Sequence, residues 1–256
     1  MEIAERLGMK RIAIIGNPNV GKSSIFNQLT GLNQKIGNYP GMTVDKMVGH
    51  FQKGDQRFEL IDLPGTYSLL PKSEDEVIAH KVLNGQGEDK PDAALVILDA
   101  CNLERSLLLG TQVMDLGIPI AFVINMKDLA EKRGLSIKTF SLYQAFGVPL
   151  VMTDARNNEG LEEVKSLFTE DKFVVGKTFH KPDSHELLEQ VQEKFGFNQP
   201  YQAFQQLIFS SFDPTLAKDK RVWLEEKAKA YQFNVEEQQT KETTERYKKI
   251  SVLLEK

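Results

Sequence analysis

The chain has 256 residues, of which 41% are hydrophobic and 27% charged, and this ordinary globular usage excludes collagen-like, coiled-coil and wholly disordered proteins. Its net charge of −4 gives no reason to expect nucleic acid as a partner. The single cysteine, Cys101, cannot form an internal disulfide, so a reducing cytosol is expected. The longest apolar runs are far shorter than the roughly 20 residues that a membrane-spanning helix needs.

The distribution of glycine predicts two architectures along the chain. Seventeen of the 18 glycines lie between Gly8 and Gly176, and turns that need a positive φ are commonest in strand-rich folds. Before Gly176, short apolar runs alternate with amphipathic segments, which predicts an α/β fold with a mainly parallel, doubly wound sheet. The rest has helical spacing and predicts a small all-α domain. The expected units are an N-terminal extension over 1–9, an α/β domain over 10–172 and a helical domain over 173–256.

Apolar runs in the first part predict the strands. A looser alternating run over 44–51 precedes a Lys-Gly-Asp turn, so we expect it to form an antiparallel hairpin with the run that follows. In the second part, Asp213 and Pro214 are expected to open one helix, and residues 235–256 to form the last. The runs expected as buried strands cover residues 11–15, 58–61, 93–98, 120–124 and 148–152.

A phosphate-binding loop is predicted directly after the first run. Residues 16–23 read GNPNVGKS and match the pattern GxxxxGK[ST] in full, between an expected strand and an expected helix. Its backbone N–H groups are expected to surround the β-phosphate. Lys22 is expected to neutralise β- and γ-phosphate oxygens, and the Ser23 hydroxyl to bind Mg²⁺. The residues expected to contact phosphate are Gly16, Asn17, Pro18, Asn19, Val20, Gly21, Lys22, Ser23 and Ser24.

Three further motifs stand in the order that a GTPase requires. Asp62 of the segment DLPG is expected to hold Mg²⁺ through a water, and the Gly65 N–H to meet the γ-phosphate. Asp128 of the segment NMKD is expected to accept from N1–H and N2–H₂ of guanine, donors that adenine does not present together. The Ala155 N–H is expected to meet guanine O6. The residues expected to bind nucleotide here are Asp62, Leu63, Pro64, Gly65, Asn125, Met126, Lys127, Asp128, Thr153, Asp154 and Ala155.

A switch segment is predicted between the phosphate loop and the DLPG motif. It holds the one threonine expected to reach both Mg²⁺ and the γ-phosphate, Thr43, with Gly41 and Met42 beside it in the nucleotide site. Mg²⁺ is therefore expected to bind to the side-chain oxygens of Ser23 and Thr43 directly and to Asp62 through a water. The residues expected to act in catalysis are Lys22, Thr43 and Gly65.

Polar residues outside these motifs offer no clear general base. Thr66 stands where many GTPases carry glutamine, and its short side chain predicts slow intrinsic hydrolysis. The acidic stretch from Ser73 to Glu76 predicts a helix N-terminus rather than a catalytic base. We expect His180 and His185 to be a solvated pair at the domain boundary rather than a metal site.

Five segments of the chain have a distinctive sequence. They are NPN within the phosphate loop, GNYPGMTV over 37–44, DLPGTYSL over 62–69, NMKD over 125–128 and TERYKKI over 244–250. Together they resemble the cytosolic GTPase domain of the ferrous iron transport protein B family of bacteria and archaea, and the resemblance runs from about Lys10 to Ile250, nearly the whole chain. It implies a P-loop GTPase fold, GTP or GDP as ligand with Mg²⁺, and a helical linker domain that leads to a membrane domain outside this chain.

The resemblance also implies ligands and partners. A potassium ion beside the phosphates would be held by the Asn19 side chain and by carbonyls of Gly37 and Tyr39, and its charge would take the place of an arginine finger. The whole protein would be a ferrous iron transporter regulated by GTP, on the cytoplasmic side of the bacterial inner membrane, with its own membrane domain as a partner. This fragment is then expected to be soluble, with homo-oligomers possible and nucleic acid not a partner.

Two alternatives share the nucleotide motifs. One is a soluble GTPase of ribosome or tRNA maturation, which would need a basic RNA-binding appendage, whereas the residues after Gly176 carry nearly balanced charge. The other is a GTP-binding scaffold that does not hydrolyse its nucleotide, which Thr66 suggests.

Overall fold

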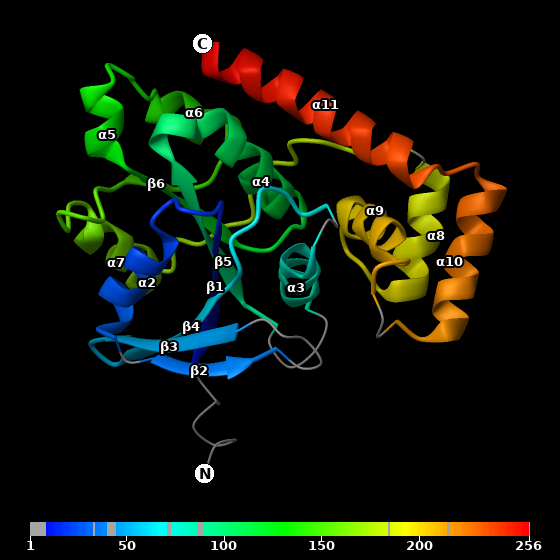
Figure 1. Ribbon diagram of the computed structural model, residues 1–256, viewed down its shortest axis with the longest axis horizontal. Helices are drawn as coiled ribbons and strands as arrows, with labels where there is room; N and C mark the ends of the chain where they lie inside the picture. The colour runs from blue at the N-terminus through cyan, green and yellow to red at the C-terminus, as the bar shows by residue number, and fades with distance from the viewer. Residues whose placement is uncertain are drawn as a thin grey trace.

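A computed structural model describes residues 9–32, 34–39, 45–70, 73–85, 90–183, 185–213 and 216–255. A sheet with helices on both faces comes first, and a group of helices packs on one side of it (Figure 1). The strands are β1 (Lys10–Gly16), β2 (Gln34–Asn38), β3 (Asp45–Lys53), β4 (Gln56–Asp62), β5 (Ala93–Asp99), β6 (Ile120–Asn125) and β7 (Leu150–Met152).

In the described residues the strands form one sheet with the order β2-β3-β4-β1-β5-β6-β7. The pairs β4–β1, β1–β5, β5–β6 and β6–β7 are parallel, whereas the pairs β2–β3 and β3–β4 at one edge are antiparallel. The predicted mainly parallel sheet and the predicted edge hairpin, β3 with β4, are confirmed. The sequence did not predict β2, because its residues are mostly exposed and show no buried face.

The helices of this part cover two faces. They are α2 (Lys22–Thr30), α3 (Glu74–Leu83), η1 (Ala100–Asn102), α4 (Leu103–Asp115), α5 (Lys127–Lys132), α6 (Thr139–Phe146) and α7 (Leu161–Thr169). Side chains alternate along β1, so that Ile12 and Ile14 pack with α2 and α7 while Ala13 and Ile15 pack with α3, α4 and α6. The parallel strands therefore carry their loops to one edge, between two buried cores.

The helical part packs into the core that contains Ala13, Ile15 and α4. Its helices are α8 (His185–Phe195), α9 (Pro200–Phe209), α10 (Lys218–Ala230) and α11 (Val235–Glu255). Leu187, Phe204 and Ile250 belong to the same buried cluster as Leu107 of α4. The long helix α11 lies across α4, which ties the two parts together (Figure 1).

Two local predictions differ from the structure. Helix α10 begins at Lys218 rather than near Asp213, because the Asp213 carboxylate forms a 2.8 Å ion pair with Lys81 of α3, and Pro214 lies outside the described residues. Strand β7 begins at Leu150, two residues later than expected. The unit boundary at residue 172 stays a prediction, and Val174 still bridges to Ile120 at the sheet.

Among the helices that the structure describes, none combines the length and the apolar character that a bilayer span requires.

Candidate functional site

The predicted phosphate loop connects β1 to α2 at the carboxyl edge of the sheet. Gly16 ends β1, and Gly21 precedes the first turn of α2 with φ of 86°, a left-handed conformation that favours glycine. A Cβ atom on Gly21 would overlap the Asn125 side chain. Lys22 and Ser23 begin α2, whose first N–H groups carry partial positive charge. The loop therefore has the geometry of an anion-binding site.

Asp62 lies beside this loop because β4 is the parallel neighbour of β1. The Leu63 N–H donates to the Ile14 carbonyl at 2.9 Å, which holds the end of β4 against β1. The Asp62 carboxylate is buried and forms an ion pair with the Lys22 ammonium. Burial raises the pKa of the Asp62 carboxyl above its usual range, and Lys22 offsets part of that rise. The site thus holds a buried carboxylate that needs a cation.

The segment after Asp62 passes directly under the phosphate loop. A Cβ on Gly65 would lie 3.2 Å from Pro18, and the Thr66 N–H donates to the Gly16 carbonyl at 3.3 Å. The Thr66 hydroxyl is buried and lies within hydrogen-bond distance of the Glu76 carboxylate, at 2.9 Å. Helix α3 begins at Glu74, as predicted. The Thr66–Glu76 contact was not predicted, because motif spacing gives no sign of it.

Asn125 connects the base-reading motifs to the phosphate loop. Its Nδ2 donates to the Val20 carbonyl at 2.8 Å, and its Oδ1 accepts from the Thr153 hydroxyl and the Ala155 N–H, both at 3.0 Å. The side chain is almost fully buried, so these three bonds have little competition from water. One amide therefore fixes two loops that the sequence separates by more than a hundred residues.

Two residues of the last motif make hydrogen bonds within the protein. The Ala155 N–H, expected to meet guanine O6, donates to Asn125 Oδ1. The Asp154 carboxylate accepts from the Arg156 and Asn157 N–H groups at 3.1 and 3.2 Å, so it shapes its own turn. Gln28 of α2, which the sequence did not single out, donates to the Ala155 carbonyl and ties this turn to α2.

Asp128 lies on the first turn of α5, immediately after β6. Met126 has φ of 66° and precedes the helix, and the Lys127 N–H donates to the Thr153 carbonyl at 3.1 Å. The Asp128 carboxylate is partly exposed, with Oδ2 3.3 Å from the Lys132 ammonium. Through the Lys127 N–H bond it therefore stands next to the Thr153–Ala155 turn that Asn125 holds.

The predicted switch and potassium residues are only partly described. Thr43, Gly41 and Met42 lie outside the described residues. Gly37 pairs with Lys46 in the β2–β3 ladder, and the Tyr39 ring is buried, with its hydroxyl 3.5 Å from the Asp62 carbonyl. Asn19 adopts φ of 65° and its side chain is exposed at the loop surface.

The residues fit a magnesium ion that shares its shell with phosphate and water. Mg²⁺ prefers oxygen ligands and is usually held by one or two protein groups plus substrate phosphates. In the parts of the chain that the structure describes, no group of three or more acidic, histidine or cysteine side chains gathers to form an all-protein metal cage. The buried Asp62 carboxylate, which pairs with Lys22, and the Ser23 hydroxyl, next to Lys22 in the first turn of α2, are oxygen ligands of the kind such a site needs.

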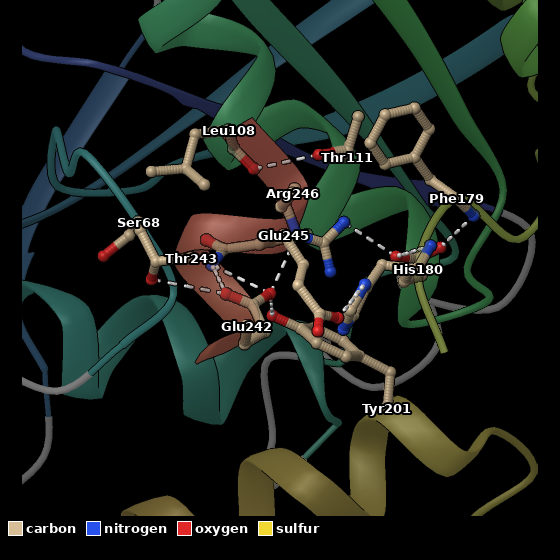
Figure 2. A network of polar contacts seen from close by, with 12 residues as sticks. Ser68, Leu108, Thr111, Phe179, His180, Tyr201, Glu242, Thr243, Glu245 and Arg246 are labelled. Carbon is tan, nitrogen blue, oxygen red and sulfur yellow. Dashed lines mark hydrogen bonds and ion pairs between the residues drawn. The ribbon is translucent and has the colours of Figure 1, made fainter. Parts of the chain in front are cut away.

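A buried polar network links this part to the helical part (Figure 2). The Leu69 N–H, in the segment after Gly65, donates to Gln112 of α4 at 2.7 Å, and Gln112 donates to Glu242 of α11 at 3.2 Å. Glu242 accepts from Arg246 at 2.8 Å and Arg246 donates to Asp115 at 2.7 Å. The sequence did not predict this network, because its members lie far apart along the chain.

His180 is not solvated, contrary to the sequence prediction. Its side chain is 4% exposed, beneath α11 and beside Arg246, and burial followed by the Arg246 charge lowers its pKa to about 4. Its backbone N–H donates to Asp115 at 3.0 Å. The segment that contains Phe179 and His180 lies in the interface because its N–H groups donate to the buried Asp115 carboxylate.

The sequence of the chain is similar to those of known iron transport proteins. Residues 10–168 match the family model described as ferrous iron transport protein B. The chain is 44% identical over 154 residues to an Fe(2+) transport protein A/Fe(2+) transporter FeoB fusion protein of Porphyromonas gingivalis, covering 60% of this chain and 18% of that protein. It is 40% identical over 163 residues to the Fe(2+) transporter FeoB of Leptospira biflexa, covering 64% and 23%. The chain thus spans about a fifth of the length of these relatives.

Solved structures resemble both parts of the chain. The cytosolic domain of L. pneumophila FeoB aligns with a TM-score of 0.79 and 31% identity, over 95% of this chain and 97% of that one. The cytosolic domain of the T. maritima FeoB transporter in its GMPPNP form aligns with a TM-score of 0.75 and 29% identity, over 96% and 98%. An S. thermophilus NFeoB mutant bound to GDP aligns with a TM-score of 0.73 and 30% identity, over 97% and 100%. With the P-loop GTPase fold established, the chain belongs to the ferrous iron transport protein B family.

Proposed function

We propose that this chain binds GTP and GDP with Mg²⁺ and hydrolyses GTP slowly. The observation that carries the proposal is the Asn125 amide, which holds the phosphate loop and the Thr153–Ala155 turn together, three residues before Asp128 in the chain. With guanine bound beside these loops, the Asp128 carboxylate would accept from its N1–H and N2–H₂ groups. The related proteins solved with GDP and GMPPNP support the same ligand class.

The residues around the phosphates would act by holding the triphosphate in place and by neutralising its negative charge. Lys22 would leave Asp62 for the β- and γ-phosphate oxygens when nucleotide enters, because the triphosphate carries more negative charge than one carboxylate. Asp62 would then hold Mg²⁺ through a water, with Ser23 and Thr43 as direct ligands. When bound there, Mg²⁺ would supply positive charge against that which develops on the transferred phosphoryl group. The Gly65 N–H would orient the γ-phosphate.

Thr66 stands where many GTPases carry the glutamine that orients the attacking water. Thr66, next to Gly65, turns its hydroxyl into the protein toward Glu76. We infer that backbone groups and a potassium ion position the water instead. Asn19 is exposed beside the phosphate loop, and it would hold K⁺ together with the Gly37 and Tyr39 carbonyls. A slow intrinsic rate follows from this design.

The whole protein is proposed to be a ferrous iron transporter whose cytosolic GTPase regulates transport. The chain covers about a fifth of relatives that are named Fe(2+) transporters. Residues 10–172 would form the GTPase domain and 173–256 the helical linker to the membrane domain, on the cytoplasmic side of the inner membrane. Its partners would be guanine nucleotide, that membrane domain and further copies of the chain, and not nucleic acid.

Nucleotide binding and hydrolysis test the proposal. We expect fluorescent GTP to bind more tightly than fluorescent ATP. The variant Asp128→Asn should bind GTP more weakly and xanthosine triphosphate more tightly than the parent does, because xanthine carries a carbonyl acceptor at C2 where guanine carries an amino donor. Asp55→Asn, in the exposed β3–β4 turn, is the matched control and should bind like the parent. Equal binding of GTP and ATP by the parent chain would overturn the proposal.

Potassium is tested separately. Phosphate release should be faster in K⁺ than in Na⁺, and Asn19→Ala should remove that difference while leaving GTP affinity largely unchanged. Equal rates in both salts would remove the potassium site only. Phosphate release no faster than in buffer would instead favour the scaffold alternative.

A further inference from the structure

Helix α6 and the turn before it expose apolar side chains to solvent. Phe140 and Tyr143 are 68% and 52% exposed, and Leu135 in the preceding turn is 44% exposed. Phe140 and Tyr143 are three residues apart on a helix, so they lie on the same face. We call Leu135, Phe140 and Tyr143 the aromatic face. It is an exposed patch that the core of the protein does not require.

The opposite side of α6 packs into the core of the protein. Leu142 and Phe146 are buried there, and Phe146 packs edge to face on Phe122 of the sheet. A surface helix of this kind normally carries polar residues outward. Clustered apolar side chains at outward positions are typical of surfaces that meet a partner or a membrane.

The sequence on either side of the aromatic face carries a net positive charge. Residues 127–147 contain four basic and two acidic side chains, in a chain whose overall charge is −4. Arg133 and Lys138 are exposed on either side of Leu135. Aromatic rings beside lysine and arginine match the headgroup region of an anionic bilayer, where rings reach the apolar boundary and basic groups attract lipid phosphate.

The same end of the molecule holds the end of α11. The Ser251 hydroxyl bonds to Glu104 at the start of α4, and α5 packs against η1 immediately before it. Figure 1 shows the last turn of α11 at the end of the molecule that carries α5 and α6. Val252 is 53% exposed there. If α11 leads to a membrane domain, as the proposed function requires, this end faces the bilayer.

We propose that the aromatic face is a lipid-docking surface that rests on anionic phospholipid headgroups. Phe140 and Tyr143 insert at the interface, while Arg133 and Lys138 lie among lipid phosphates. This contact orients the cytosolic part so that the carboxyl edge of the sheet, with Asp128 on the neighbouring α5, stands close to the membrane surface. The inference rests on the proposed function only for the direction in which α11 continues.

Vesicle flotation of the 256-residue chain tests this surface. We expect the chain to float with vesicles that contain phosphatidylglycerol at low salt, and to bind phosphatidylcholine vesicles much less, because the basic groups add an electrostatic attraction. The double variant Phe140→Ser/Tyr143→Ser should lower the bound fraction about fivefold or more. Arg133→Glu/Lys138→Glu should reduce it as well and weaken its salt dependence.

A matched control comes from the other end of the sheet. Leu32 and Ile36 are each 68% exposed, beside and within the edge strand β2, and they lie outside the aromatic face. Leu32→Ser/Ile36→Ser removes a comparable exposed apolar area and should float like the parent. Circular dichroism of all variants checks that each is folded before flotation.

The outcomes separate the possible occupants of the surface. No flotation of the parent with anionic vesicles, or unchanged flotation of Phe140→Ser/Tyr143→Ser, would overturn the proposal. A parent dimer in analytical ultracentrifugation that this variant converts to a monomer, without any vesicle binding, would assign the surface to a second copy. GTP binding is measured in parallel: its absence from the parent overturns the proposed function, whereas vesicle binding reports on the lipid surface alone.

Discussion

Arg246 of α11 and Asp115 of α4 form an ion pair of 2.7 Å in which neither side chain is exposed to solvent. Glu242, one turn before Arg246, contacts the same guanidinium at 2.8 Å and is also buried. Figure 2 shows Tyr201 and His180 beside this cluster. Two buried carboxylates therefore depend on one cation, at the junction between the sheet and the helical part.

Replacing the shared cation should destabilise the protein strongly. In Arg246→Met the stem of the side chain is kept, but the Asp115 and Glu242 carboxylates lose their buried partner. We expect the free energy of unfolding to fall by about 3–5 kcal/mol, because an unpaired buried charge is costly. Urea denaturation followed by circular dichroism measures the change.

Lys241→Met is the control on the same helix. Its ammonium pairs with Asp183 at the surface, where both side chains are about half exposed. Exposed pairs contribute little, so the urea midpoint should hardly move. A similar loss in both variants would show that Arg246 contributes no more than a surface charge.

Gln112 connects the segment after the DLPG motif to α11 through hydrogen bonds of its side-chain amide. Its Oε1 accepts from the Leu69 N–H and its Nε2 donates to Glu242. Gln112→Leu keeps the volume but leaves both partners buried without this bond. We expect a loss of about 1–3 kcal/mol in unfolding free energy. Gln52→Leu, exposed in β3, should have little effect, and an equal loss in the two variants would contradict the role of Gln112.

The sequence predicted the parts of the site that are continuous in the chain. The phosphate loop and the DLPG segment depend on neighbouring residues and on the strands that flank them, so pattern and spacing were enough. The contacts of Asn125 were missed in detail, because they join Val20, Thr153 and Ala155 only after the strands pair. The sheet order made the motifs meet, as expected for parallel strands that end at one edge.

Long-range polar contacts could not be predicted in the same way. Asp115 and Arg246 each look like ordinary charged helix residues, and their buried pairing depends on how α11 crosses α4. The burial of His180 follows from that crossing too. Strand β2 was missed because edge strands with exposed faces carry no period-two apolar signal.

Gly21 should not accept a side chain. Its φ of 86° is strained for alanine, and a Cβ would overlap the Asn125 amide that holds the base-reading loops. Gly21→Ala should therefore reduce both stability and guanine nucleotide affinity. Gly54→Ala, at φ of 60° with no atom within 4 Å of the added Cβ, carries only the backbone cost of about 1 kcal/mol. Thermal denaturation and nucleotide titration compare them, and equal affinities would remove the proposed role of this contact.

His80 should make the protein less stable as the pH falls below neutrality. It is buried on α3, stacked on Phe209 with ring centroids 3.8 Å apart, and burial lowers its pKa to about 3 despite the nearby Asp213 charge. In the unfolded chain a histidine binds its proton near pH 6.5. Between these values the unfolded state holds the extra proton, so the free energy of unfolding should decrease as pH falls from 7 to 5, by about 2 kcal/mol from this residue alone.

His80→Phe should remove that part of the pH dependence while keeping a ring against Phe209. Urea unfolding at pH 7 and pH 5 gives the two free energies, and their difference should shrink by about 2 kcal/mol in the variant. Some dependence should persist, because burial also lowers the pKa of His180. His50→Gln, with a side chain that is 46% exposed, is the control and should retain the parent difference. An unchanged pH difference in His80→Phe would mean that His80 does not stay neutral in the folded protein.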